Sequence, residues 1–157
     1  MKPTIRVIAV GGLKEQFFLK AQAYYLNELT PLYNISVVEL PDEPAPDNLS
    51  AAGRQAVLVS EGGRIMSRLT PINITVSLAV EGRFANLSFF SDLIGKAAGA
   101  DKGLDFIIGG SLGLAGGVLE RSDYRISLSR LTFPHRLTRL LLLDILLNAS
   151  FKGKIRL

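Results

Sequence analysis

The chain has 157 residues, of which 48% are hydrophobic and 20% are charged, and its formal net charge at pH 7 is +4. This length predicts a single domain over residues 1–157 that can bury a full core. The hydrophobic share excludes a disordered chain. The sequence holds no cysteine and one histidine. It therefore excludes disulfides, thiolate nucleophiles and metal sites built from cysteines or from several histidines.

The basic side chains are concentrated towards the C-terminal end. Residues 1–78 carry seven basic and seven acidic side chains, whereas the 37 residues 121–157 carry eight basic and two acidic ones, a net charge of +6. A polyanionic partner would explain this bias, and a solvated basic surface without a partner is the alternative. Composition alone favours neither.

No segment predicts a secretory signal or a membrane span. The apolar run at residues 7–10 is too short for the core of a signal peptide. The most apolar segment, residues 137–147, contains Thr138, Arg139 and Asp144 and falls short of the roughly 20 residues that cross a bilayer. We therefore expect a cytoplasmic protein that has no membrane segment.

The first half of the chain predicts two strands and two helices. Apolar, β-branched residues predict strands at 5–10 and 35–40, and helical spacing of apolar residues predicts helices at 14–29 and 50–69. Residues 41–48 contain three prolines and three acidic residues, so they indicate a surface loop.

The second half continues the same alternation. In chain order, we expect a strand at 73–80 that ends at Glu81-Gly82, a helix at 88–98, a strand at 104–108, a helix at 114–120, a strand at 124–128 and a helix at 134–151. Strands alternating with helices predict an α/β fold, a mostly parallel sheet with helices on both faces. Ligands bind at the carboxyl ends of such strands, which directs attention to the loops after Val10, Val80, Ile108 and Leu128.

The segment Gly109-Gly110-Ser111-Leu112-Gly113 joins a predicted strand to a predicted helix. Its spacing does not match the dinucleotide fingerprint, and it lacks the Gly-Lys-Ser/Thr ending of a phosphate-binding loop. It does match the G-x-S-x-G nucleophile elbow, so a small serine hydrolase with Ser111, Asp123 and His135 as its triad is one hypothesis. The other is a tight turn whose glycines let the backbone approach a ligand.

The predicted last helix is apolar on nearly all sides and must be buried. We expect part of its surface to face a second copy of the chain in a homodimer, and burial within its own subunit is the alternative. Thr132 and Pro134 suit the start of this helix. Considered alone, His135 is expected to be solvent-exposed or bonded to the backbone.

Two long motifs together resemble the RlmH family. They are Phe-Ile-Ile-Gly-Gly-Ser-Leu-Gly-Leu at 106–114 and Ser-Leu-Ser-Arg-Leu-Thr-Phe-Pro-His at 127–135. Shorter matches are residues 7–11, Glu61-Gly62, Leu78 and Gly82, so that the resemblance covers roughly residues 5–146. This family comprises SPOUT-class methyltransferases that methylate N3, the ring nitrogen between the two carbonyl groups, of a pseudouridine in bacterial large-subunit (23S) ribosomal RNA.

The resemblance implies a C-terminal trefoil knot, a homodimer and S-adenosylmethionine as the cofactor. Catalysis would rest mainly on holding the target nitrogen in line with the methyl group. The nitrogen must also lose its proton, and the group that accepts it is left open. The family's cofactor positions correspond here to Leu78, Gly109, Leu128, Ser129, Arg130, Leu131, Thr132 and Phe133.

Ribosomal RNA as the partner gives the basic end of the chain a role. The candidate RNA-binding residues are Arg130, His135, Arg136, Arg139, Lys152, Lys154 and Arg156. The family usually ends in a tail that contains Tyr-His, whereas residues 148–157 contain neither residue. No catalytic role is therefore carried over to the tail. An RNA- or ribosome-binding protein that keeps the fold but has impaired turnover is the alternative to an active enzyme.

Overall fold

Strands and helices alternate throughout residues 1–151, the part of the chain that the computed structural model describes. The strands are β1 (Thr4–Val10), β2 (Asn34–Leu40), β3 (Ile74–Phe84), β4 (Leu104–Ile108) and β5 (Tyr124–Ser127). The helices are α1 (Gln16–Leu29), α2 (Ala51–Met66), α3 (Leu87–Gly99), α4 (Gly116–Arg121) and α5 (His135–Ala149). Every predicted element is present, and the clear difference in bounds is at the end of β3.

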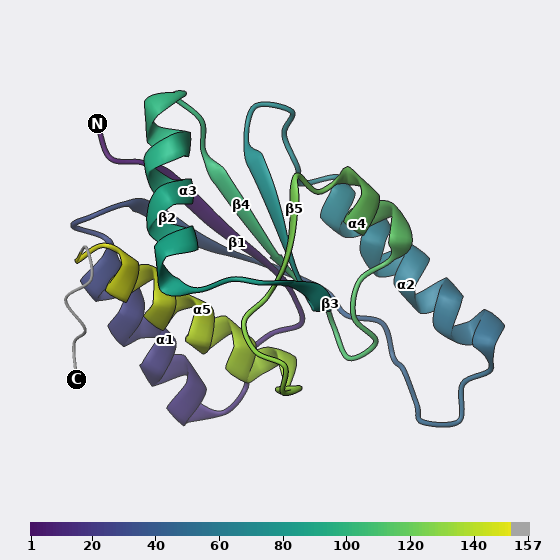
Figure 1. Cartoon of the computed structure of the whole chain (residues 1–157). Helices are drawn as coiled ribbons and strands as arrows, with labels where there is room; N and C mark the ends of the chain where they lie inside the picture. Colours follow the sequence, from purple (N-terminus) through teal and green to yellow (C-terminus); the bar gives the residue numbers. More distant parts are fainter. Residues whose placement is uncertain (152–157) are drawn as a thin grey trace.

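The strands form one sheet with the order β2-β1-β4-β3-β5, and every neighbouring pair is parallel. Parallel neighbours need crossover connections, which here are the helices. Figure 1 shows α1, α3 and α5 on one face of the sheet and α2 and α4 on the other. The predicted α/β fold with helices on both faces is confirmed.

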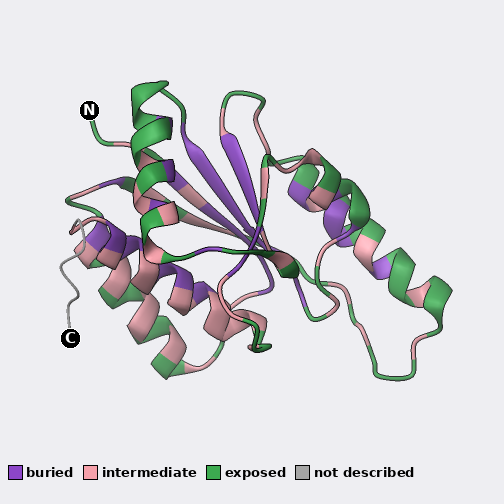
Figure 2. Ribbon diagram, in the orientation of Figure 1, coloured by how far each residue is buried: buried purple, intermediate pink, exposed green. Residues whose placement is uncertain are grey.

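Apolar side chains fill both spaces between sheet and helices. The larger cluster includes Phe90, Phe106 and Leu142, and the smaller one includes Ile8 and Ile107. All residues of the central strand β4 are buried, as expected for a strand covered on both faces. Figure 2 shows this burial along the middle of the sheet.

Polar side chains set the start of two helices. The Ser50 hydroxyl accepts a hydrogen bond from the backbone N–H of Gly53 at 3.0 Å, and the Asn86 side chain accepts one from Phe89 at 3.0 Å. Each cap satisfies a backbone donor that has no partner within its helix.

The third strand extends beyond its expected end. β3 continues through Glu81-Gly82 to Phe84, and its pairing with β5 shifts register between Leu78 and Arg83. A Cβ on Gly82 would lie 2.7 Å from the carbonyl carbon of Ile126. The glycine therefore lets two backbones approach closely, and the prediction that it ends the strand is wrong.

No helix within residues 1–151 has the length and apolar composition that a membrane crossing requires. The trefoil knot and the extent of the domain remain predictions.

Candidate cofactor site

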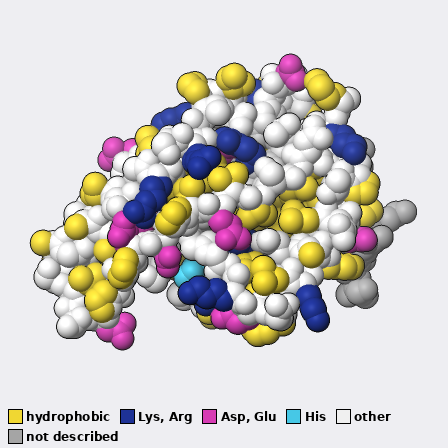
Figure 3. All heavy atoms as spheres, turned by 180° about the vertical axis from the view of Figure 1, so that it is seen from behind, with side chains coloured by type: hydrophobic (Ala, Val, Ile, Leu, Met, Phe, Trp, Pro, Cys, Tyr) yellow, Lys and Arg dark blue, Asp and Glu magenta, His cyan; other side chains and the backbone are white. Residues whose placement is uncertain are grey.

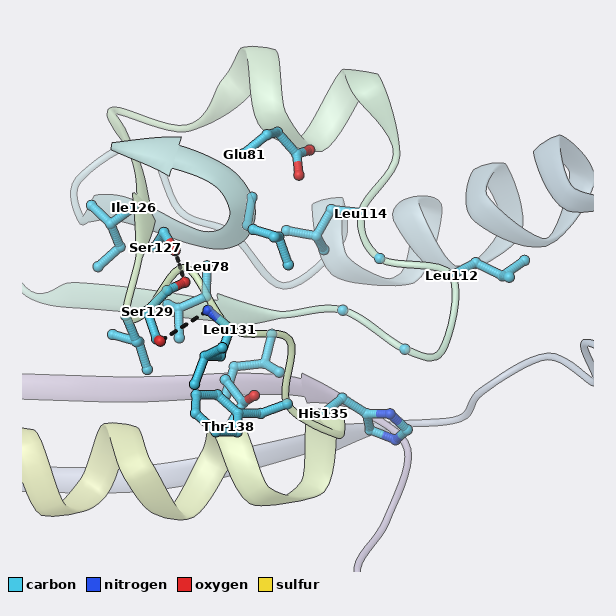
Figure 4. Close-up of a pocket in the computed structure, with 18 residues that line it drawn as sticks. Leu78, Glu81, Leu112, Leu114, Ile126, Ser127, Ser129, Leu131, His135 and Thr138 are labelled. Carbon is cyan, nitrogen blue, oxygen red and sulfur yellow. Dashed lines mark hydrogen bonds between the residues drawn. The ribbon is translucent and has the colours of Figure 1, made fainter. Parts of the chain in front are cut away.

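A cavity of about 340 Å³ lies at the carboxyl ends of β3, β4 and β5 (Figure 4). Its walls come from residues 78–81 within β3, from the ends of β4 and β5 with the segments that follow them, and from the first turn of α5. The volume is within the range of small-molecule sites in proteins. The cavity therefore lies where the topology of a parallel sheet places a ligand. Residues after Val80, Ile108 and Leu128, three of the four positions indicated by the sequence, border it, although the residues after Val80 belong to β3 and not to a loop.

The turn after β4 folds back on itself because three of its residues are glycines. Gly113 has a φ of +84°, and its N–H donates to the carbonyl oxygen of Gly110 at 3.1 Å. A Cβ on Gly109 would lie 2.7 Å from the carbonyl carbon of Gly113. Gly109 is thus required by the turn itself, and the turn presents its backbone to the cavity.

Hydrogen bonds shape the segment between β5 and α5. The Ser127 hydroxyl donates to the carbonyl oxygen of Ser129 at 2.6 Å, and the N–H of Leu131 donates to the Ser129 hydroxyl at 3.0 Å. These local bonds bend the chain towards the cavity, where Leu131 and Phe133 form part of the wall.

Six of the eight residues assigned to the cofactor line this one cavity, although they come from three separate strands. They are Leu78, Gly109, Leu128, Ser129, Leu131 and Phe133. The other two, Arg130 and Thr132, are exposed and do not line it. Residues 129, 131 and 133 line the cavity and residues 130 and 132 do not, so alternate side chains of this segment face it. Cofactor binding by these residues remains a prediction.

Two charged or titratable side chains at the cavity were not assigned to it from the sequence. Glu81 is exposed and lines it from β3, and His135 lines it from the start of α5. Glu81 lies within the register shift of β3, between Leu78 and Arg83, and periodicity in the sequence does not predict such a shift. His135 ends the second family motif, so the signal for it was present in the sequence.

The pKa of His135 is lowered from its ordinary value. Burial of the ring is the main cause, and the positive charges of Arg136 and Arg139 act in the same direction, while the carboxylate of Asp42 opposes them. A Cβ on Gly11 would lie 3.5 Å from Nε2 of His135. These surroundings favour the neutral imidazole, which lies beside Gly11 at the end of β1 and borders the cavity.

The serine hydrolase hypothesis does not fit this structure. Ser111 is exposed in the turn after β4 and does not line the cavity. Asp123 precedes β5 and accepts a hydrogen bond from the N–H of Thr75 at 2.8 Å, near the start of β3. Because the strands are parallel, Ser111 and Asp123 lie towards opposite ends of the sheet, and the proposed triad is not assembled.

The predicted RNA-binding arginines differ in their surroundings. Arg130 is exposed, whereas Arg136 is half-buried and forms an ion pair with Glu15 at 3.1 Å. Arg139 is 1% exposed; its guanidinium donates to Glu39 at 3.0 Å and to the carbonyl oxygen of Gly11 at 2.8 Å. The position of Arg139 contradicts a role in RNA contact, because the face of α5 that carries it packs inward.

Three further RNA candidates, Lys152, Lys154 and Arg156, lie outside the described residues. Within residues 1–151, no group of three or more His, Cys, Asp or Glu side chains is arranged to hold a metal ion.

Comparison with known proteins agrees with the motifs. Residues 3–150 match the family described as Predicted SPOUT methyltransferase. The chain is 40% identical over 146 residues to Ribosomal RNA large subunit methyltransferase H of Carboxydothermus hydrogenoformans, covering 92% of each protein. It is 43% identical over 141 residues to Ribosomal RNA large subunit methyltransferase H 2 of Caldanaerobacter subterraneus, covering 89% of this chain and 94% of that protein. A Listeria monocytogenes relative with the name methyltransferase H is 40% identical, with 89% of each covered. Because these matches span nearly the whole chain, it belongs to the SPOUT methyltransferases and, within them, to the RlmH family.

Proposed function

We propose that this protein is an S-adenosylmethionine-dependent methyltransferase that acts on ribosomal RNA of the large subunit, with a pseudouridine of 23S RNA as its target. The names of the relatives support the RNA substrate, and the family motifs support the pseudouridine. The observation that carries the proposal is the convergence of six motif residues from three strands on one cavity.

The cavity has the chemistry that an adenosine-containing ligand needs. Leu78, Ile126 and Leu131 provide apolar walls for a planar base. The backbone of the glycine turn offers hydrogen-bonding groups, and the Glu81 carboxylate can accept from ribose hydroxyls or an ammonium group. S-adenosylmethionine supplies an electrophilic methyl group when bound, and the residues of this chain hold and orient the reactants.

For RNA contact, we propose the surface formed by Arg130, Arg83 and Phe84, next to the cavity. Arg130 and Arg83 are exposed, and Phe84 is 62% exposed at the end of β3. Arg83 and Phe84 pair with Ile126 and Ser127, both of which line the cavity. Arginine binds phosphate and exposed aromatic rings stack on unpaired bases, so this surface suits single-stranded RNA. Arg136 and the basic residues beyond 151 remain further candidates.

We also propose a homodimer formed through the first half of α5. Leu137, Leu140 and Leu141 are half-buried and belong to neither core cluster among the described residues. Leu142 is completely buried within the subunit and is not an interface residue. A charge at Leu141 should therefore weaken association, which light scattering measures; a wild type that is monomeric at micromolar concentration would contradict the dimer.

A cytoplasmic location is proposed together with the ribosomal substrate.

Two measurements test the proposed function. Isothermal calorimetry with S-adenosylmethionine should show binding, and no heat at about 1 mM cofactor would contradict the cavity assignment. Transfer of a radiolabelled methyl group to large subunits or assembled ribosomes should then label 23S RNA at a pseudouridine. Cofactor binding without transfer to either substrate would favour the alternative, a ribosome-binding member of the family that has lost turnover.

A further inference from the structure

The one histidine of the sequence is positioned to act on a group held in the cavity. His135 lines the cavity from the start of α5 and is half-buried (Figure 4). No hydrogen bond to this ring is formed by the residues that the structure describes. Its free ring nitrogen therefore has an unused lone pair.

The charges around the ring come from four parts of the chain. Arg136 and Arg139 lie on α5 with His135, and they pair with Glu15 before α1 and Glu39 of β2. Asp42, in the segment after β2, lies near the same Cβ position of Gly11 as the His135 ring, with its Oδ2 4.0 Å from that position. Figure 3 shows the histidine at the surface among basic and acidic side chains.

These surroundings favour the neutral ring. Burial and the two arginines lower the pKa of His135, and Asp42 alone among its neighbours raises it. A neutral imidazole can take up a proton at pH 7, which an imidazolium cannot.

The proposed reaction needs such a group. The target is a ring nitrogen between two carbonyl groups, and its N–H proton must leave before or as the nitrogen bonds to the methyl carbon. We propose that His135 is the proton acceptor for this nitrogen. The inference rests on the proposed function, and it identifies the base that the sequence motifs left open.

In the proposed step, the N–H bond of the target breaks and its proton moves to the free ring nitrogen of His135. The electron pair of the target nitrogen forms the bond to the methyl carbon, and the electrons of the broken sulfur–carbon bond stay on sulfur. The imidazolium of His135 then returns its proton to water.

A direct readout comes from NMR titration, because one histidine gives one set of ring signals. The wild-type pKa should lie below the ordinary value of 6.5. Asp42→Asn should lower it further, since the carboxylate no longer stabilises the imidazolium. Asp47→Asn, an exposed acidic residue of the same loop, is the matched control and should leave it unchanged.

The kinetic test is single-turnover methyl transfer to ribosomal subunits from about pH 5 to about pH 9. The rate should fall at low pH with an apparent pKa equal to the His135 pKa that NMR gives. Asp42→Asn should shift the kinetic pKa and the NMR pKa by the same amount. His135→Asn should lower the rate by about 10² to 10⁴-fold and remove the acid limb. Its affinity for S-adenosylmethionine should stay within about twofold, because the ring acts on the target and not on the cofactor.

The two proposals fail in different ways. If the wild type is active, either of two results overturns the role of His135 alone. One is that His135→Asn keeps the full rate. The other is that the acid limb of Asp42→Asn does not follow the NMR pKa of its histidine. A wild type that neither binds the cofactor nor transfers a methyl group overturns the proposed function, and the role of His135 with it.

Discussion

The two ends of the sheet handle polar groups in opposite ways. At the amino end, the buried Asp105 carboxylate accepts from the Arg6 guanidinium at 2.6 and 2.7 Å and from the Asn73 amide at 2.9 Å. Asp123 adds two hydrogen bonds to the backbone of Thr75, at 2.8 and 2.9 Å. The buried Asp105 carboxylate is therefore paired with a cation, and Asp123 is held by the backbone of β3.

At the carboxyl end, buried polar atoms lack partners. Among residues 1–151, five buried side-chain atoms make no hydrogen bond; one belongs to Thr75, and four belong to residues near the carboxyl end, namely Glu15, Glu61, Arg136 and Arg139. The cavity and the neutral His135 lie at this same end. Native structures satisfy most buried polar groups, so these four side chains have hydrogen-bonding capacity that the described residues do not use. The contrast agrees with the proposal that the amino end stabilises the fold and that the carboxyl end carries the reaction.

The largest expected effect tests the amino end. Arg6→Ala should reduce the free energy of unfolding by about 3–5 kcal/mol, because it leaves the fully buried Asp105 without its cation. Urea denaturation measures this loss. The folded fraction should bind S-adenosylmethionine with the wild-type affinity, and a large loss of affinity in that fraction would break the proposed division between the two ends.

The next effect tests the glycine turn at the carboxyl end. Gly109→Val should weaken binding of S-adenosylmethionine by about 100-fold or more, since the side chain would push Gly113 away and open the turn. Calorimetry on folded protein, checked by circular dichroism, gives the affinity. Gly117→Ala is the matched control, because a Cβ there meets nothing within 4 Å and should leave binding intact. The turn assignment fails if both variants bind equally well.

A smaller effect distinguishes two arginines near the start of α5. Arg130→Gln should weaken RNA binding severalfold and reduce the log–log salt slope by about 0.7 to 0.9, the value for one lost phosphate contact. Arg139→Met should leave the slope unchanged, because this side chain is buried against Glu39 and Gly11. Filter binding with large-subunit RNA at several salt concentrations measures both. The reverse result would mean that Arg139 leaves its site when RNA binds.

The smallest effect concerns Glu61 of α2, beneath the glycine turn. Its Oε1 lies 3.0 Å from the Cβ position of Gly110, and burial is the main cause that raises its pKa. The folded protein therefore holds this proton more tightly than the unfolded chain does. Stability from this group is complete below the ordinary value of 4.5 and is lost as pH rises through the raised pKa.

Glu61→Gln should abolish that loss, which amounts to about 1.4 kcal/mol for each unit of pKa difference. Urea denaturation of both proteins over a pH series measures it. Parallel stability curves for wild type and variant above pH 4.5 would show that Glu61 titrates normally.

Much of the fold follows from local patterns. The periodicity of residues 5–10, 88–98 and 104–108 indicated elements that the structure contains with similar bounds. The parallel sheet followed from their alternation, and the loops after Ile108 and Leu128 were correctly indicated as the border of a cavity, whereas the residues after Val80 border it as part of β3. These features depend on neighbours in the sequence or on general rules of topology, so one sequence suffices to predict them.

Local patterns and the two motifs thus give the order of elements, the glycine turn and the motif positions that reach the cavity. The packing of the folded chain sets which face of α5 is covered, and therefore that Arg139 is buried while Arg136, three residues earlier, is half-buried. It also separates Asp123 from Ser111 and brings His135 to the cavity. These placements depend on contacts between residues far apart in the chain, which set the rotation of α5 against α1 and the sheet and the register shift of β3.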